Sequence, residues 1–436
     1  MMKLFSRLML VLALGVTSPA YASQDGEVTL KLIETSDVHG CYFSYDFTSM
    51  KPRKGGLACV SSFVKEQREQ YGDGVVLMDN GDILQGQPIA YYYNYIDTTS
   101  VHVTSAMLNY MKYDVGTMGN HDVETGHAVY DRWVKQCAFP VLGANIVDNK
   151  TGEPYLTPYK IIERKGVKIA VLGMITPAIP SWLPEQLWNG LHFEDMEDCA
   201  RKWVKIIKEK ENPDVLIGLF HAGPEGNKLD NVVENGSGDV AKNVPGFDVV
   251  FMGHDHVRRC EKIVNVAGDS VLLVDPANAA RYVSDVTVKV TKAGGKLVRK
   301  SVEGALADVS RYAADEDFMR EFAGQYQATV DFVSRKIGRI EETITTKDAY
   351  LGPSAFIDLL HQLQLDITGA DISFCAPLSF SAEIKKGDIY MSDMFNLYKY
   401  ENLLYTMKLT GKEIKDFLEM SYALWTCLLY TSPRPR

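Results

Sequence analysis

One hydrophobic–polar pattern recurs between residues 28 and 256. A short apolar, β-branched run ends, and polar side chains able to bind metal follow within three positions. The runs occupy residues 28–33, 75–78, 115–118, 214–220 and 249–252. Runs this short and continuously apolar are typical of strands buried on both faces, as in sheets covered by helices.

Amphipathic patterns separate these strand-like runs. Apolar residues recur at helical spacing within residues 57–64 and within residues 199–207. The chain becomes strand-rich after residue 269, where runs 270–274 and 286–290 can complete a second sheet of the same domain. Alternating strands and helices predict a layered α/β fold with ligands gathered at the strand ends.

A second domain is predicted after a long helix. The apolar stripe of residues 315–337 predicts one connecting helix, roughly 30 Å long at 1.5 Å per residue. Residues 410–413 form a capping box that opens a later helix toward Trp425. We therefore predict a first domain over residues 23–310, a connecting helix over 311–337 and a second domain over 338–425.

Both ends of the chain differ from the rest. Residues 1–22 combine Lys3 and Arg7, an apolar run shorter than the roughly 20 residues that span a bilayer, and an Ala20-x-Ala22 cleavage pattern. They predict a signal peptide cleaved after Ala22, and hence an exported protein, periplasmic or extracellular, without a stable membrane anchor. Residues 426–436 interrupt a helical pattern and are interpreted as a non-native tail, with a genuine floppy terminus as the alternative.

Charge and cysteine content limit the functional classes. The chain has 436 residues and a formal net charge of −10, which argues against a general binder of nucleic-acid polymers. At roughly 100–200 residues per domain, this length suggests two or three domains. The seven cysteines are odd in number and lack CxxC spacing, so they do not indicate a disulfide framework, although one pair could bond.

The polar residues that follow the five runs carry the candidate chemistry. Each motif alone is weak, because an Asp or His after a strand is usually a turn, a cap or a satisfied core residue. Together they are informative, because all follow strand-like runs and can converge at one sheet edge. Five of the nine histidines belong to them, and the remaining four are interpreted as structural. The motifs are Asp37-x-His39, Gly81-Asp82, Gly119-Asn120-His121-Asp122, His221 and Gly253-His254-x-His256.

The types of side chain in these motifs constrain the metal. Carboxylate, amide and imidazole groups without cysteine suit Mn, Zn, Fe or Ni better than Ca or an iron–sulfur cluster. The potential ligands are too many for one tetrahedral zinc and enough for two ions about 3.5–4 Å apart, which can clamp a phosphoryl group during in-line displacement. Two divalent cations would also make the pocket of an acidic protein attractive to an anionic substrate.

The motif set resembles the signature of the calcineurin-like metallophosphoesterases. Together with the leader and the second domain, it makes the chain similar to the exported 5′-nucleotidase and 2′,3′-cyclic-nucleotide phosphodiesterase family, from about residue 28 to 425. The resemblance implies a layered αββα catalytic domain followed by a partial α/β nucleotide-binding domain. It also implies two divalent metal ions, Mn, Zn or similar, and a small nucleotide substrate.

The resemblance assigns roles by position. It implies that Asp82 bridges the two ions and that His121 stabilises the transferring phosphoryl group or the leaving oxygen, paired with Glu124. Asp122 is a competing partner of His121, interpreted rather as a cap or supporting group. The implied ligands of one ion are Asp37, His39 and His256, and those of the other are Asn120, His221 and His254.

Substrate selection rests on less of the sequence. The segment at residues 400–402 matches the one that carries a base-stacking ring in the family, which implies Tyr400 and Asn402 as substrate-binding residues; a sheet-packing role for Tyr400 is an equal alternative. Residues 374–379 lack the Gly-rich, Arg-containing loop of relatives. The prediction is hydrolysis of nucleotide phosphoesters. The alternatives are another phosphorylated substrate, such as a nucleotide sugar, or metal binding without turnover.

Overall fold

The computed structural model describes residues 26–226, 228–229, 232–350, 352–376, 381–398 and 404–431. Three predicted features lie outside these residues: the signal peptide, the pair Tyr400 and Asn402, and positions 432–436 of the predicted tail. The chain divides into two units, residues 1–333 and 334–436. The domain boundaries predicted at residues 310, 337 and 425 stay predictions.

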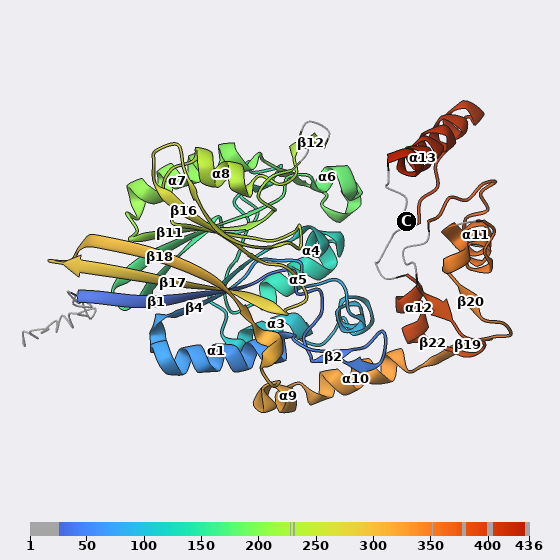
Figure 1. The fold of residues 1–436 in the computed structure, drawn as a ribbon, viewed down its shortest axis with the longest axis horizontal. Coiled ribbons are helices and arrows are strands. Elements are labelled where there is room, and N and C mark those ends of the chain that lie inside the picture. Colours follow the sequence, from blue (N-terminus) through green and yellow to red (C-terminus); the bar gives the residue numbers. More distant parts are fainter. Residues whose placement is uncertain are drawn as a thin grey trace, which may run out of the picture. The chain divides into compact units, whose positions relative to one another are not determined.

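Two six-stranded sheets form the centre of the first unit (Figure 1). The first sheet has the order β18 (Lys296–Asp308), β17 (Tyr282–Ala293), β1 (Gly26–Thr35), β4 (Val75–Asp79), β5 (Val115–Thr117) and β6 (Val141–Leu142). The second has the order β15 (Arg258–Val264), β16 (Ser270–Pro276), β14 (Val249–Met252), β11 (Val215–His221), β9 (Val167–Ile175) and β8 (Tyr159–Arg164). The chain therefore begins the first sheet, builds the second and returns to the first.

The sheets pack face to face through apolar side chains. Leu30, Leu32 and Val76 of the first sheet share one buried cluster with Ile217 and Val249 of the second. The central strands β4, β9, β11 and β14 are covered on both sides and are apolar at nearly every position. The edge strands β15 and β18 instead carry many exposed polar residues. β1, β4, β5 and β6 run parallel, as do β9, β11, β14 and β16, so the carboxyl ends within each set meet at one edge.

Helices cover the outer faces of this sandwich (Figure 1). α7 (Met196–Lys210) and α8 (Ser237–Asn243) bury their apolar faces against the second sheet. α1 (Leu57–Tyr71) packs on β1 and β4, and α3 (Val103–Met111) packs beside α5 (His127–Gln136). The unit also contains the short helices α2 (Pro88–Tyr91), α4 (Asn120–Glu124) and α6 (Ile179–Trp182). Its small two-stranded ribbons pair β2 (Tyr45–Asp46) with β3 (Lys51–Pro52), β7 (Ile146–Asp148) with β10 (Leu191–Phe193), and β12 (Lys228–Leu229) with β13 (Val232–Val233). The layered αββα prediction is confirmed.

Two local expectations were wrong. The strand-like runs do not share one sheet, because β1, β4 and β5 lie in the first and β11 and β14 in the second. The stripe at residues 315–337 is not one helix: α9 (Glu316–Glu321) and α10 (Ala323–Val333) are separated at Phe322, and the chain is a strand from Lys336. Phe322, which lies at this break, is buried, and its ring packs on Tyr110 of α3 at 5.5 Å between centroids.

The described residues of the second unit form short strands and three longer helical segments. The strands are β19 (Lys336–Ile340), β20 (Ile344–Thr345), β21 (Glu383–Ile384) and β22 (Gly387–Tyr390), and the helices are α11 (Ala355–Thr368), α12 (Met391–Leu397) and α13 (Gly411–Thr431). The predicted capping box is present at the start of α13, where Thr410 N donates to Glu413 Oε2 at 2.7 Å and Glu413 N donates to Thr410 Oγ1 at 3.3 Å. α13 continues beyond Trp425 to Thr431.

Two further observations concern the described residues only. Six of the seven cysteines have described side chains, and none of these six forms a disulfide. None of the described helices combines the length and the apolar composition that crossing a bilayer requires.

Candidate metal centre

The predicted ligands lie on loops at the carboxyl ends of the parallel strands. Asp37 and His39 follow β1, Asp82 follows β4, and Asn120 begins α4 directly after β5. The second sheet contributes His221, the last residue of β11, and the pair His254 and His256 after β14. The stacking of the two sheets brings the two sets together, which is why residues more than two hundred positions apart can meet.

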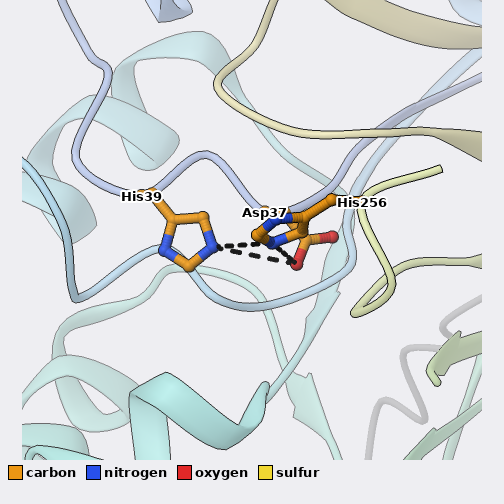
Figure 2. A group of neighbouring side chains, drawn as sticks. All are labelled: Asp37, His39 and His256. Atoms are coloured by element: carbon orange, nitrogen blue, oxygen red, sulfur yellow. Dashed lines mark hydrogen bonds and ion pairs between the residues drawn. The ribbon is translucent and has the colours of Figure 1, made fainter. Parts of the chain in front are cut away.

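Asp37, His39 and His256 form the first group of potential ligands (Figure 2). His39 Nε2 lies 3.1 Å from His256 Nε2, and His256 Nε2 lies 3.2 Å from Asp37 Oδ1. The potential ligand atoms of this group all lie within 4.8 Å of one another. Two ring nitrogens and a carboxylate oxygen directed at a common point are a donor set suited to a divalent cation.

Asp82, His221 and His254 form the second group, and Asn120 lies within it. His221 Nε2 lies 3.2 Å from Asp82 Oδ2 and 3.1 Å from Asn120 Oδ1. His254 Nδ1 lies 2.8 Å from the same amide oxygen. Asp82 Oδ2 is also 3.9 Å from His39 Nε2, so this carboxylate faces both groups. The position suits a bridging ligand, and the donor set fits two divalent ions.

The outward-facing nitrogens of three of these histidines contact acceptors. Nδ1 of His221 lies 2.6 Å from the backbone oxygen of Asn80, Nδ1 of His39 lies 3.2 Å from that of Gln85, and Nε2 of His254 lies 3.0 Å from Glu234 Oε1. An N–H that donates outward leaves the inward nitrogen as a lone pair, the form that binds metal. Sequence reasoning missed all three partners: a backbone carbonyl has no residue signature, and Glu234 lies outside the strand-end motifs.

The backbone of the centre is strained. Asp37, His39, Asp82, His254 and His256 all have φ between 48° and 77°. Non-glycine residues in this region cost about 1–3 kcal/mol each and persist only where the surroundings fix them. Such clusters are typical of functional sites.

Close packing against Asp82 explains why position 119 is a glycine. A Cβ at Gly119 would lie 2.2 Å from Asp82 Oδ1, so a side chain there would displace the carboxylate.

Both carboxylates of the centre are buried, Asp37 with 0% and Asp82 with 1% of its surface exposed. Burial alone would raise the pKa of Asp82, but the facing rings of His221 and His121 outweigh it and hold the pKa well below its usual range. Burial likewise opposes charge on His221, yet the facing Asp82 and Asp37 carboxylates raise its pKa to about 10, so a cation that binds at Nε2 would displace a proton from that nitrogen. The carboxylates are thus kept ionised, as metal binding requires.

His121 lies beside the first group rather than in either group. Its ring is 5.4 Å from that of His39, its Nδ1 is 2.6 Å from Glu124 Oε2, and its backbone N–H donates to Asp82 Oδ1 at 2.8 Å. Burial would lower the pKa of His121, but the Asp82 carboxylate and the Glu124 hydrogen bond raise it to about 9.

Among the described residues, no contact joins Asp122 to the His121 ring. Asp122 instead connects the loop after β4 to the loop after β5. Its carboxylate accepts the backbone N–H groups of Asp82, Ile83, Leu84 and Gly119 at 2.8–2.9 Å. This agrees with the interpretation of Asp122 as a cap and supporting group.

The comparison with known families gives two matches. The family described as calcineurin-like phosphoesterase matches residues 30–258, and the 5′-nucleotidase C-terminal domain matches residues 336–427. The first match covers more than half of the chain and includes every residue of both ligand groups. The chain belongs to the calcineurin-like phosphoesterase family. Its reaction class is therefore phosphoric ester hydrolysis.

Named members of this family are similar over nearly the whole chain. A 2′,3′-cyclic-nucleotide 2′-phosphodiesterase/3′-nucleotidase of Haemophilus influenzae is 29% identical over 98% of this chain and 72% of its own length. The trifunctional nucleotide phosphoesterase protein YfkN of Bacillus subtilis is 27% identical over 93% of this chain, which spans 31% of that protein. A crystal structure of B. subtilis YfkN matches with a TM-score of 0.62 and 25% identity, covering 71% of this chain and 100% of that one.

Proposed function

We propose that this phosphoesterase hydrolyses nucleotide phosphoesters with two divalent ions, as a 5′-nucleotidase, a 2′,3′-cyclic-nucleotide phosphodiesterase or both. The observation that carries the proposal is the pair of ligand groups that face a shared Asp82, with His121 directly beside them. A single structural metal would need one such group. A metal store would not need His121 and Glu124.

The residues take distinct roles in this proposal. Asp37, His39 and His256 would hold one ion, Asn120, His221 and His254 would hold the other, and Asp82 would serve both. Two bound ions, Mn, Zn or similar, would supply Lewis-acid activation of water and neutralise charge on the phosphoryl group. His121 is placed to donate a proton to a phosphoryl or leaving-group oxygen, while the hydrogen bond between its Nδ1 and Glu124 fixes the ring.

A small nucleotide is the proposed substrate. The support is the match of residues 336–427 to the 5′-nucleotidase C-terminal domain and the nucleotide activities in the names of the relatives. Tyr400 and Asn402 are the proposed base-binding residues in that domain. We also propose that the protein acts after export, in the periplasm or outside the cell, where it would release nucleoside and phosphate.

Product analysis tests the proposal directly. The full chain, supplied with Mn²⁺ or Zn²⁺, is incubated with 5′-AMP, 2′,3′-cyclic AMP and a nucleotide sugar, each with and without chelator, and the products are separated by chromatography. Hydrolysis of 5′-AMP gives adenosine and phosphate, whereas opening of the cyclic diester gives adenosine monophosphate without free phosphate. We expect hydrolysis of at least one of these two nucleotide esters and its loss on chelation. Hydrolysis of the nucleotide sugar alone would move the proposal to that substrate class. Metal binding without hydrolysis of any ester would contradict it.

A further inference from the structure

Asn80 is a fully buried polar residue at the junction of the two sheets, directly after β4. Its side-chain Nδ2 donates to Glu34 Oε1 at 2.9 Å and to the backbone oxygen of Phe220 at 3.1 Å. Its Oδ1 accepts a hydrogen bond from Thr117 Oγ1 at 2.9 Å. One amide thereby connects β1 and β5 of the first sheet to β11 of the second.

The main chain of Asn80 contacts a ligand of the second group. Its N–H donates to Thr35 O at 2.7 Å, and its carbonyl oxygen lies 2.6 Å from Nδ1 of His221. His221 is the last residue of β11, and Phe220, which the Asn80 side chain binds, directly precedes it. The same residue therefore fixes the strand end that carries His221 and accepts from the ring of His221.

Glu34 completes this arrangement from the opposite side. It is fully buried, and besides Asn80 it accepts from Ser284 Oγ of β17 at 2.6 Å. Burying a carboxyl group in this position lowers the stability of the fold, and a well-packed apolar residue would lower it less. Neither Glu34 nor Asn80 belongs to the potential ligand groups. Their hydrogen bonds converge on the peptide that orients His221, which gives a reason for burying them.

We propose that Glu34 and Asn80 are a positioning pair that holds His221 Nε2 toward the second ligand group, so that the pair sets the affinity of that group for its ion. The proposal rests on the two-ion assignment made above. Partners that orient a metal-binding histidine contribute about 10–100-fold to metal affinity. The first group receives no ligand from the β11 strand end and should be affected far less.

Manganese binding to metal-depleted full-length protein tests the pair. Calorimetry gives the affinities of the two ions, and electron paramagnetic resonance separates an exchange-coupled Mn²⁺ pair from an isolated ion. In Asn80→Ala we expect the second ion to bind about 10–100-fold more weakly, with the first within about threefold of wild type. Glu34→Ala should act in the same direction. Glu34→Gln, which keeps an acceptor for Asn80, should restore most of the affinity.

Two further variants, Thr117→Val and Thr329→Val, separate an effect on the positioning pair from general unfolding. Thr117→Val removes one hydrogen bond to Asn80 without changing side-chain size. It should lower the affinity of the second ligand group for its ion and leave that of the first group unchanged. Thr329 is equally buried, and its hydroxyl donates within α10 to Gln325 O, so Thr329→Val should leave both affinities unchanged. Equal weakening of both ions, wild-type affinities in Asn80→Ala, or an unaffected second ion in Thr117→Val would overturn the proposal. A wild-type protein that binds fewer than two ions would instead refute the two-ion assignment.

Discussion

Nδ1 of His121 lies 2.6 Å from Oε2 of Glu124, three residues later on α4. Residues at this spacing share one face of a helix, so the short helix itself sets the contact. The backbone N–H of His121 also donates to Asp82 Oδ1. The orientation of the proposed proton donor and that of the proposed bridging carboxylate are therefore fixed by the same turn of chain.

Substitution of His121 should reduce turnover without lowering the metal content of the protein. A positioned acid or base contributes typically about 10²–10⁴-fold, so His121→Ala should lose activity within that range. Its metal content should stay at the wild-type level, because the ring is in neither ligand group. Steady-state phosphate release and elemental analysis of the same preparation measure the two quantities.

His127→Ala is the matched control for this prediction. His127 Nδ1 lies 3.1 Å from Asp131 Oδ2 on α5, so it forms another histidine–carboxylate pair on a helix without membership of either ligand group. Its removal should leave turnover near wild type. A parallel loss of metal and activity in His121→Ala would assign that residue to metal binding instead.

Asp82→Asn should lower the metal content itself. The carboxylate faces both ligand groups and is kept ionised despite burial, so replacing it with an amide removes charge from both at nearly unchanged size. We expect elemental analysis to find less than half of the wild-type metal after identical loading, with activity reduced in proportion. Asp131→Asn is the matched surface change. Full metal occupancy in Asp82→Asn would rule out the bridging role.

Chelation should destabilise the first unit. Ion binding adds about 2.7 kcal/mol when the free ion is at 100 times its Kd, and each kcal/mol corresponds to roughly 2–4 °C in Tm for large domains. Removal of the ions also leaves five residues with positive φ without the metal contacts that would offset their backbone strain. Differential scanning calorimetry should show a Tm drop of several degrees in wild type and a much smaller one in Asp82→Asn. Equal drops would indicate that the chelator acts elsewhere.

The sequence predicted the strand ends because their signals are local. Continuous apolar runs mark strands covered on both faces, and Asp, Asn and His directly after them mark the ligand edge, as at Asp37 and His221. Which sheet a run joins depends on pairing with distant strands such as β17, so the assignment of the five runs to two different sheets was missed. The same limit applies to Asn80, whose environment is made by residues 34, 117, 220 and 284.

The break at Phe322 shows the limit of periodicity for helices. An apolar stripe at 3.6-residue spacing fits one long helix as well as two short ones that bend over a core. Phe318 and Phe322 both pack on Tyr110 of α3, and this tertiary contact has no signature in the local sequence. Substrate-binding positions are harder still, because their assignment depends on a resemblance at only a few residues.

Asp315 should make the first unit sensitive to acid, because it ties α9 to α1. Its carboxylate accepts from Ser61 Oγ at 2.6 Å and from Lys65 Nζ at 2.7 Å, and it caps α9 through Asp317 N. Burial would raise the pKa of Asp315, but these hydrogen bonds outweigh it and lower the pKa. Hydrogen bonds to charged groups contribute about 1.5–3 kcal/mol, so Asp315→Asn should lose up to that much free energy of unfolding at neutral pH.

The pH dependence of this loss follows from the sign of the shift. A folded-state pKa below the unfolded value of about 3.9 means that the contribution is complete well above pH 4 and disappears as the pH falls through the folded pKa. Urea unfolding of wild type and Asp315→Asn should therefore differ at pH 7, and the difference should shrink as the pH falls below the unfolded value of about 3.9 and through the folded pKa. Asp317→Asn, which removes the exposed partner of the same lysine, should change little at any pH because solvent screens that pair. A wild-type advantage that persists or grows on acidification would show that Asp315 contributes through packing rather than through its charge.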